Sequence, residues 1–487
     1  MDGSQYTLLA IALYTLSIIG LLVFSRRFQK SFESFAVGSR TDSPIFVGLS
    51  LAANMTSAAT FVINPGLVYL YGLSGFWGYA VAAPLGIFSA LIVMSKRFRK
   101  IGDEFRVLTI PQWIGERYQS RGLRIFFAFL SLLQITFIVL IAVGITVVLA
   151  KVLNVPYQLI LGIILIFTLT YIAIGGASIH ILTNSLQGVI MITVAVLLLF
   201  SGPFFSHIGL GELFQKLSAI DPNLVRPVNP QSILFRDFFE VFVANFIVGI
   251  AIICQPHILS KALYLRSERD VNAYLATTVT VASLFFFVLF AGLYARVALT
   301  GQVLPPDQSM AAYIQQVFPA PVLAIVSLGI LAAGFSTLEG LFLALSTIFS
   351  LDFLKQVFRK RFEGATEEAN RRVLKVSRIF LVVLAVVVYF LSIEQIENPS
   401  LSVAIFAQNG VYGLFVASFW PIFLGIFARK VKTWIPAVAA VTGLIIHFGM
   451  YYGKITHYSS NPGVCAAVAL LLTAGFVLGA TYLTRRS

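Results

Sequence analysis

Thirteen long apolar runs make up most of this 487-residue chain. Each run is close to the roughly 20 residues that an α-helix needs to cross the hydrocarbon core of a bilayer. The composition agrees, because 58% of the residues are hydrophobic and only 11% are charged, whereas a soluble domain carries about 25% charged residues. Uninterrupted runs without β-barrel alternation favour helices, so the sequence predicts an all-α polytopic membrane protein with about 13 transmembrane helices. The predicted spans are roughly 6–25, 45–72, 75–95, 124–150, 156–175, 183–206, 237–260, 271–296, 319–352, 374–393, 400–428, 433–452 and 463–484.

Lysine and arginine residues are distributed unevenly between the predicted loops. The loops after odd-numbered helices, together with the C-terminus, hold 28 of the 34 basic residues, and the opposite side holds six. Cytoplasmic loops of membrane proteins carry such an excess. We therefore predict a multi-pass protein of the plasma (inner) membrane with its N-terminus outside and its C-terminus in the cytoplasm. The net charge of +14 then suits an anionic lipid bilayer and not a nucleic acid, because a chain this apolar has no solvated face for phosphates.

Two of the predicted helices contain interruptions. Helix 2, SLAANMTSAATFVINPGLVYLYG (50–72), is rich in small and hydroxyl residues and is interrupted at Pro65-Gly66. Helix 7, FVANFIVGIAIICQPHILSK (242–261), contains Asn245, Gly249 and Pro256. The two helices are five apart, so repeats of that length are inverted in the membrane, and paired interruptions of this kind indicate the binding site of a transporter. The alternative is that the small residues only allow close helix packing.

Helix 9 carries oxygen-bearing side chains on one face. In LGILAAGFSTLEGLFLALS (328–346), Ala333, Ser336 and Thr337 follow an i, i+3, i+4 spacing, which places them together. Ala53 and Thr56 repeat the i, i+3 spacing in helix 2. An unwound helix frees carbonyl groups, and carbonyls with hydroxyls are the ligands that a sodium ion needs. Serine and threonine also serve as packing residues in membrane helices, so the spacing leaves both interpretations open.

At these residues the sequence resembles the sodium/solute symporter family over nearly the whole chain. The resemblance implies a LeuT-like core of two inverted five-helix repeats, with helices 1, 12 and 13 outside it. The corresponding segments are 1–44 for the first helix and its cytoplasmic loop, 45–208 for helices 2–6, 209–428 for the outer loop and helices 7–11, and 429–487 for the last two helices. The motifs that carry the resemblance are FAVGSRTDSPIFVGLSLAANMTSAATFVINPG (35–66), LTIPQWIGERY (108–118), the GG…TN..Q stretch (175–187), CQPHILSKALYLRSERD (254–270) and ILAAGFSTLEG (330–340).

The resemblance also implies a sodium site between helices 2 and 9. Carried over by position, its ligands are the backbone carbonyls of Ala53, Thr56 and Ala333 and the hydroxyls of Ser336 and Thr337. Sodium is then the coupling ion, and the resemblance implies no other cofactor.

Asn184 departs from the family pattern. Many relatives carry an aspartate after the double glycine, where this chain has Thr183-Asn184-Ser185. A carboxylate there can support a second cation, whereas an amide supplies no charge, so we expect one coupled sodium ion. The alternative role for Asn184 is a capping residue at the start of helix 6.

Glu339 is a second departure, because relatives usually have a small hydroxyl residue there. A carboxylate at membrane depth costs roughly 2.5–3.5 kcal/mol on insertion scales, and the apolar stretches of helices 2–11 contain no lysine or arginine to pair with it. Two roles stay open: cytoplasmic ion exit or coupling, or a neutral, hydrogen-bonded acid between helices. Among the histidines, His257 is expected to make a structural hydrogen bond, and His180 is expected in or near a loop.

The candidate solute contacts are Thr60, Asn245 and Gln408. Gln408 stands where sugar-transporting relatives have a glutamine on helix 11, and Thr60 stands at a polar position on helix 2. The polar contacts that those relatives have on helix 3 correspond here to Ala82 and Leu85. A sugar would then leave hydroxyls unpaired, at roughly 1–3 kcal/mol each. We expect a small, mostly apolar solute such as a monocarboxylate or an amino acid.

The sequence therefore predicts a sodium-coupled symporter that imports a small organic solute by alternating access, and not an enzyme, since no catalytic motif is visible. Its partners are the solute, Na⁺ and the lipid bilayer; a single chain is sufficient for transport, and the sequence does not fix the oligomeric state. Three alternatives remain: a proton-coupled carrier using Glu339, a symporter for a sugar or another solute, and a membrane sensor that binds solute without transport.

Overall fold

The computed structural model describes residues 3–25, 43–302, 304–358, 367–398, 402–428 and 431–486. Over these residues eleven helices are long and apolar enough to cross a membrane, and two bent helix pairs raise the number to thirteen if each pair is one span. This confirms the prediction of an all-α polytopic protein. The GSR element at 38–40 lies outside the described residues.

The uninterrupted spans lie close to the predicted apolar runs, and several of them contain a short π-helical or 3₁₀ segment, labelled η. The spans are α1 (Gly3–Ser25), α5–η3–α6 (Leu73–Phe76, Trp77–Ala82, Ala83–Glu104), α8–η4–α9 (Arg121–Leu130, Ser131–Gln134, Ile135–Leu153), α10 (Tyr157–Leu199), α14–η9–α15 (Asp270–Phe287, Val288–Phe290, Ala291–Ala298), α17–η10–α18 (Ala320–Ile348, Phe349–Leu354, Lys355–Val357), α20 (Glu367–Glu397), α21 (Val403–Phe427), α22 (Trp434–Gly453) and α23 (Pro462–Arg486).

Shorter helices lie in the connections between spans. The loop between predicted helices 3 and 4 contains α7 (Ile110–Arg117), and the long loop after predicted helix 6 contains α11 (Leu210–Ile220). A further helix, α16 (Pro306–Val317), precedes α17. Two short segments, η5 (Gly202–Ser206) and η6 (Pro222–Val225), complete this group.

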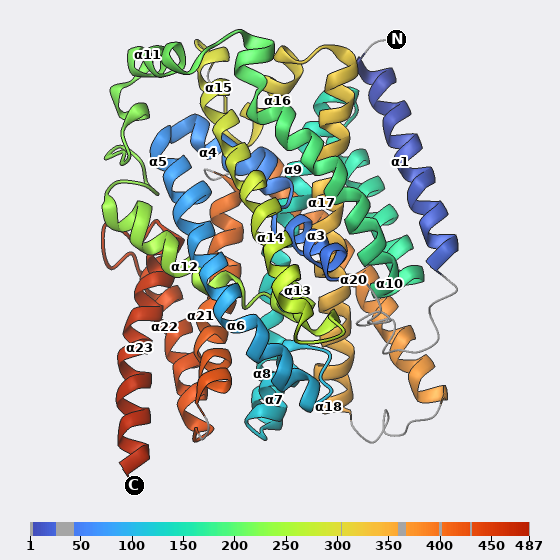
Figure 1. Cartoon of the computed structure of the whole chain (residues 1–487), viewed down its shortest axis with the longest axis vertical. Coiled ribbons are helices and arrows are strands. Elements are labelled where there is room, and N and C mark those ends of the chain that lie inside the picture. The colour runs from blue at the N-terminus through green and yellow to red at the C-terminus, as the bar shows by residue number, and fades with distance from the viewer. Residues whose placement is uncertain are drawn as a thin grey trace.

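The two bent pairs are the predicted helices 2 and 7. Helix 2 consists of α3 (Pro44–Met55) followed by η2 (Ala59–Ile63) and α4 (Asn64–Tyr71). Helix 7 consists of η7 (Phe239–Ala244) and α12 (Asn245–Ile252), followed by α13 (Pro256–Leu259) and η8 (Ser260–Tyr264). The segments α3 and α13 lie near the middle of the molecule (Figure 1), and α3, α13 and α17 contact one another.

Helix α10 contains two spans and folds back on itself. Its backbone is helical throughout, yet Tyr171 and Gln187 both donate a hydrogen bond to the same oxygen of Glu339. In a straight helix a sequence separation of 16 residues would place them about 24 Å apart along the axis, which is farther than the two side chains reach. The two spans, Tyr157–Ile174 and Leu182–Leu199, therefore lie side by side, as the predicted helices 5 and 6 require.

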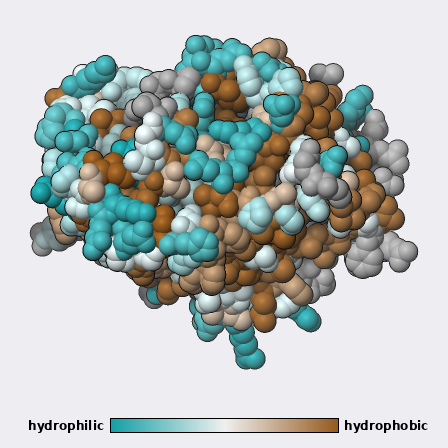
Figure 2. Space-filling view, turned by 90° about the horizontal axis from the view of Figure 1, so that it is seen from above, coloured by the Kyte–Doolittle hydropathy of each residue, from teal (hydrophilic) through white to brown (hydrophobic). Residues whose placement is uncertain are grey.

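The surface has the apolar flank that a bilayer requires. Large apolar side chains such as Leu16, Ile166 and Phe390 are more than 60% exposed, an exposure that in a membrane protein corresponds to lipid contact. Seen from above in Figure 2, hydrophilic residues gather on the upper face and apolar residues cover much of the flank. In Figure 1 the chain begins at the top and ends at the bottom, at the end that also holds α7, α8 and α18.

Candidate ion and solute site

The break in helix 2 lies at residues 56–58, between α3 and η2, where the axis bends by 53°. Thr56 is extended there, with φ −112° and ψ 97°. The predicted position at Pro65-Gly66 is therefore wrong, because both residues lie within α4. A π-helical turn just before Pro65 accommodates the proline without ending the helix. A Cβ on Gly66 would lie 2.1 Å from the Pro306 carbonyl oxygen, so this glycine serves close packing against α16.

The break in helix 7 lies where Pro256 predicted it. Helix α12 ends at Ile252, Gln255 is extended, and Pro256 begins α13 after a bend of 59°. Gly249 has the packing role that small residues often have in membrane helices. A Cβ at Gly249 would lie 2.2 Å from the Ala83 carbonyl oxygen of α6.

Four of the five predicted sodium ligands lie within hydrogen-bonding distance of one another. The Ser336 hydroxyl lies 2.9 Å from the Ala53 carbonyl oxygen and 2.8 Å from that of Ala333. The Thr337 hydroxyl lies 3.2 Å from the Asn54 carbonyl oxygen and 3.4 Å from that of Ala333. All five residues are fully buried. The end of α3 and the middle of α17 thus bring a group of uncharged oxygen atoms together.

The end of α3 explains why its carbonyls are available. The last four carbonyl groups of a helix lack an N–H partner in the next turn, and α3 ends at Met55. The C-terminus of a helix also carries a partial negative charge, which favours a cation. Thr56 lies in the break, and its hydroxyl donates to the Ala52 carbonyl at 2.6 Å. Within the described chain, no hydrogen bond joins the Thr56 carbonyl to α17.

Asn54, which the sequence analysis did not select, links the broken helix 2 to the broken helix 7. Its side-chain amide donates to the His257 carbonyl at 3.2 Å, in the second half of helix 7. Its own carbonyl accepts the Thr337 hydroxyl. A Cβ on Gly340 would lie 2.7 Å from the Asn54 side chain. The sequence could have indicated this role, because Asn54 is an asparagine within a stretch of apolar and small residues, next to the predicted ligand Ala53.

Asn184 lies within α10 and is not an N-cap. It is fully buried, and its amide nitrogen lies 3.4 Å from the Ser336 carbonyl oxygen. The capping alternative is therefore wrong, because the helix is already continuous at this position. The residue is next to the predicted ion ligands and brings an uncharged amide to them.

Glu339 is fully buried and surrounded by hydrogen-bond donors from α10. Its carboxylate accepts from the hydroxyl of Tyr171, from the hydroxyl of Thr183 at 2.6 Å, and from the amide of Gln187 at 2.7 Å. His180 Nδ1 lies 3.3 Å from the same carboxylate. His180 lies between the two spans of α10, near the connection of the predicted helices 5 and 6, and it is only 2% exposed. Of the two roles left open for Glu339, these contacts describe the hydrogen-bonded acid between helices.

The first helix joins the same group of side chains. Gln187 also lies 2.7 Å from the Tyr14 hydroxyl, and the Tyr14 ring stacks on Phe335 with centroids 6.2 Å apart. A helix outside the predicted inverted repeats thus contacts the surroundings of Glu339.

A central cavity of about 110 Å³ lies beside the break in helix 2. Two of the three predicted solute contacts, Thr60 and Gln408, line this cavity. Its polar side chains are uncharged hydroxyls and amides, and its other walls are apolar or aromatic. The lining residues are Met55, Ser57, Ala59, Thr60, Asn64, Ile87, Phe137, Leu140, Ile252, Gln255, Phe286, Ala404, Ala407, Gln408, Val411, Tyr412 and Phe415.

Two of the amides that line this cavity, those of Gln408 and Gln255, differ in their hydrogen bonds. The Gln408 amide donates to the Tyr79 hydroxyl at 2.8 Å. Gln255, in the break of helix 7, is buried, and the oxygen of its side-chain amide has no hydrogen-bond partner among the described residues. Helix 3 contributes the apolar Ile87, while Leu85 is 54% exposed on the outside of the bundle.

Asn245 does not line the central cavity. Its amide donates to two carbonyls of its own helix, those of Glu240 at 2.8 Å and Val241 at 3.3 Å. The structure therefore separates Asn245 from Thr60 and Gln408, which the sequence reading had grouped. The period of helix 7 places Ile252 and Gln255 toward the cavity instead.

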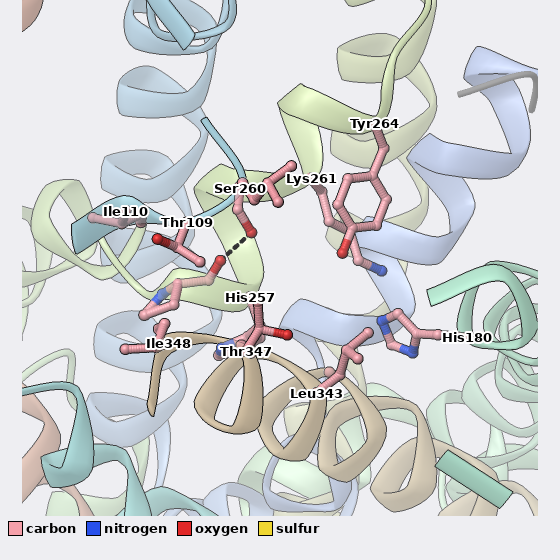
Figure 3. A pocket seen from close by; sticks show the side chains of 14 residues that line it. Thr109, Ile110, His180, His257, Ser260, Lys261, Tyr264, Leu343, Thr347 and Ile348 are labelled. Atoms are coloured by element: carbon pink, nitrogen blue, oxygen red, sulfur yellow. Dashed lines mark hydrogen bonds between the residues drawn. The ribbon is translucent and has the colours of Figure 1, made fainter. Parts of the chain in front are cut away.

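A second, inner cavity of about 20 Å³ is lined in part by α17 residues that follow the ion ligands along the chain (Figure 3). On α17 it is lined by Gly340, Leu343, Ala344 and Thr347, which continue the helix face of Ser336 toward the C-terminal end of α17. The other walls come from α13 and η8, from the segment before α7, and from α10. Figure 3 shows His180 and Lys261 on the same side of this cavity.

Two residues of the inner cavity differ from the sequence expectation. Lys261 is only 2% exposed, although it directly follows the predicted span 237–260 and is therefore one of the 28 basic residues assigned to the cytoplasmic side. Its ammonium group donates to the Ser50 carbonyl at 2.9 Å and to the Ser50 hydroxyl at 2.6 Å. His257 was expected to make a structural hydrogen bond, but both of its ring nitrogens are buried without a protein partner. That expectation is wrong.

Comparison with known proteins agrees with this geometry. The sequence model of the sodium:solute symporter family matches residues 35–446. The chain belongs to this family. The family and the relatives described next are transporters and not enzymes, and Na⁺ is the coupling ion that the family implies.

Symporters named for pantothenate and for proline are among the relatives of this chain. A sodium/pantothenate symporter of Haemophilus influenzae is 26% identical, over 91% of this chain and 89% of that protein. A sodium/pantothenate symporter of Escherichia coli is 25% identical, over 97% and 95%. A sodium/proline symporter of Salmonella typhimurium is 25% identical, over 95% and 91%.

The fold of this symporter has a solved counterpart. A Na⁺-coupled sialic acid symporter, in a substrate-bound outward-open state, superposes with a TM-score of 0.77 over 97% of both chains, at 16% identity. At this identity the likeness concerns the fold, which is LeuT-like, as the family resemblance predicted.

Proposed function

We propose that this symporter imports a small, mostly apolar organic solute, such as a monocarboxylate or an amino acid, together with one sodium ion by alternating access. The observation that carries the proposal is the convergence of carbonyl and hydroxyl oxygens from Ala53, Ala333, Ser336 and Thr337. Oxygen ligands suit a hard alkali cation, and the break at Thr56 adds further carbonyls next to them.

Ion and solute are coupled through the break in helix 2. Ala53 contributes to the ion-ligand group, and Met55, Ser57 and Thr60, a few residues further on, line the central cavity. Ordering this segment around sodium therefore also orders one wall of the solute cavity. A ligand shifts a conformational equilibrium only by its difference in affinity for the two states, and a shared segment gives ion and solute a preference for the same state.

The lining of the central cavity supports the solute class. Apart from the Tyr412 hydroxyl, the polar side chains that line it are the uncharged Ser57, Thr60, Asn64, Gln255 and Gln408, and the other lining residues are apolar, which suits a small, mostly apolar solute better than a sugar with many hydroxyls. The start of the outer half of helix 2 faces the cavity, and helix N-termini favour a carboxylate. The relatives named for pantothenate and proline transport solutes with a carboxylate.

One sodium ion supplies enough free energy for accumulation. A single charge that crosses 100 mV provides about 2.3 kcal/mol, which corresponds to roughly a 50-fold concentration ratio for a neutral solute. The uncharged Asn184 beside Ser336 supports a single cation. The basic side of the molecule is the cytoplasmic side in this proposal, so the N-terminus lies outside.

Uptake by purified protein in proteoliposomes tests this function. We expect an inward sodium gradient to drive accumulation of at least one labelled carboxylate among pantothenate, L-proline and lactate, and collapse of the gradient with a sodium ionophore to abolish it. Sodium-driven uptake of glucose but of none of the carboxylates would refute the solute class. Uptake that needs no sodium would refute the coupling.

A proton-coupled carrier is the second candidate, because the buried Glu339 lies 3.3 Å from His180. In the same liposomes an inward pH gradient without sodium distinguishes the two. Proton coupling requires uptake under that gradient and its loss in Glu339→Gln. Saturable solute binding without any net uptake would instead indicate a sensor.

A further inference from the structure

The inner cavity differs from the central cavity in charge. It is lined by Lys261, a buried cation that has no carboxylate within ion-pair distance in the part of the chain that the structure describes. Among the residues that the structure describes, the lining of the central cavity contains no charged side chain. Glu339 lies one residue before Gly340 but does not line the inner cavity, because its carboxylate faces α10.

Three polar atoms of the inner cavity have no protein partner. They are both ring nitrogens of His257 and the hydroxyl of Thr347, and both residues are about 3% exposed. Buried polar groups in proteins are normally hydrogen-bonded. With Lys261 beside them, these atoms form a polar, positively charged lining. The cavity volume of about 20 Å³ holds a water molecule, so a solute enters only when the segments that line the cavity move apart.

The two cavities meet at one aromatic ring. Phe137 lines the central cavity, and the same ring stacks on His257 of the inner cavity, with centroids 6.4 Å apart and an interplanar angle of 25°. On helix 7, Gln255 faces the central cavity and His257 faces the inner one. A solute that leaves the central cavity toward the C-terminal end of α17 therefore meets His257 and Lys261 next.

We propose that the inner cavity is the release station for a solute that carries a carboxylate, and that Lys261 is the counter-charge for that carboxylate. His257 and Thr347 provide the hydrogen bonds, and the Phe137 ring separates this station from the central cavity. The inference rests on the proposed function and narrows its substrate to small organic anions. A cationic lining opposes a sodium ion, so the solute and not the ion is the ligand of this cavity.

Transport measured from each side of the membrane tests the proposal. Right-side-out and inside-out membrane vesicles that contain the full protein are assayed with labelled pantothenate, L-proline and lactate, and KM is determined for each face. For Lys261→Met we expect the cytoplasmic-face KM to rise about tenfold or more, as for the loss of a charged hydrogen bond. The outer-face KM should stay within about twofold, because the central cavity is unchanged.

Ser50→Ala is the matched control. It removes the hydroxyl partner of Lys261 and leaves the charge, so the cytoplasmic-face KM should change little. Lys261→Arg keeps a cation and should retain most of the affinity. If Lys261→Met fails to fold, Thr347→Val carries the test, because it removes a hydroxyl that bonds no protein group and should raise only the cytoplasmic-face KM.

Three results would overturn the proposal. An unchanged cytoplasmic-face KM in both Lys261→Met and Thr347→Val would remove this cavity from the solute path while leaving the proposed function intact. If replacing chloride with sulfate abolishes the effect of Lys261→Met, the station holds chloride and not the solute. If the wild type transports none of the three carboxylates, the proposed substrate class fails, and this inference fails with it.

Discussion

Ser336→Ala is the substitution that tests the ion site most directly. The Ser336 hydroxyl is the side-chain contact between α17 and the Ala53 carbonyl of the broken helix 2, at 2.9 Å, and it also lies 2.8 Å from the Ala333 carbonyl. In the proposed sodium site its oxygen is an ion ligand. Alanine removes this oxygen and leaves the backbone carbonyls in place.

The expected effect is a moderate loss of sodium affinity. The ion-bound state loses a contact to a charge, worth about 1.5–3 kcal/mol, whereas the ion-free state loses an ordinary hydrogen bond, worth about 0.5–1.5 kcal/mol. The difference of about 1–1.5 kcal/mol corresponds to a rise of about fivefold to tenfold in the sodium concentration for half-maximal uptake. Initial uptake rates in proteoliposomes, measured against external sodium with choline to hold ionic strength, give this value.

Ser346→Ala is the matched control on the same helix. Ser346 is also fully buried, but its hydroxyl donates only to the Leu343 carbonyl of α17, at 3.0 Å. We expect its sodium dependence to equal that of the wild type. A Ser336→Ala protein with unchanged sodium dependence, or a Ser346→Ala protein with the same shift, would refute the assignment of Ser336 to the site.

Three further substitutions probe the surroundings. Gly340→Ala places a Cβ 2.7 Å from the Asn54 side chain, so it should lower the free energy of unfolding in detergent by about 1–3 kcal/mol. A melting temperature equal to that of the wild type would contradict this packing. Glu339→Gln replaces a carboxylate that accepts three hydrogen bonds with an amide, half of which donates. It should lower the free energy of unfolding by about 1–3 kcal/mol, and the folded protein should retain sodium-driven uptake. Loss of uptake at unchanged stability would support a coupling role instead. Gln408→Ala should raise the solute KM about fivefold or more, whereas Asn245→Ala, outside the cavity, should not; equal effects of the two would contradict the placement of the cavity.

The oxygens of the ion site were predictable because they follow local rules. Ser336, Thr337 and Ala333 share a helix face through an i, i+3, i+4 spacing, and that spacing survives any arrangement of the other helices. The family resemblance supplied the partner segment around Ala53. The structure then places these groups 2.8–3.4 Å apart.

Positions that depend on which way an irregular segment turns were not predictable. The break of helix 2 was expected at Pro65, but a π-helical turn accommodates this proline and the chain unwinds at Thr56 instead. The orientation of Asn245 was not predictable for the same reason. A π-helical segment precedes it, and its side-chain amide donates to carbonyls of its own helix. Lys261 directly follows the predicted span 237–260 and was therefore counted among the cytoplasmic basic residues, and only the fold buries it.

The sequence alone determined the membrane-spanning helices, the presence of two interrupted spans, and which hydroxyl groups share a face of α17. Each of these depends on composition or on the fixed 3.6-residue period of a helix, which needs no knowledge of neighbouring segments. Only the tertiary structure decided the surroundings of Glu339, the separation of Asn245 from the cavity, and the burial of Lys261 beside His257. These depend on contacts between residues more than 150 positions apart, such as Glu339 with Thr183 and Lys261 with Ser50, and no local period specifies which helix faces will meet.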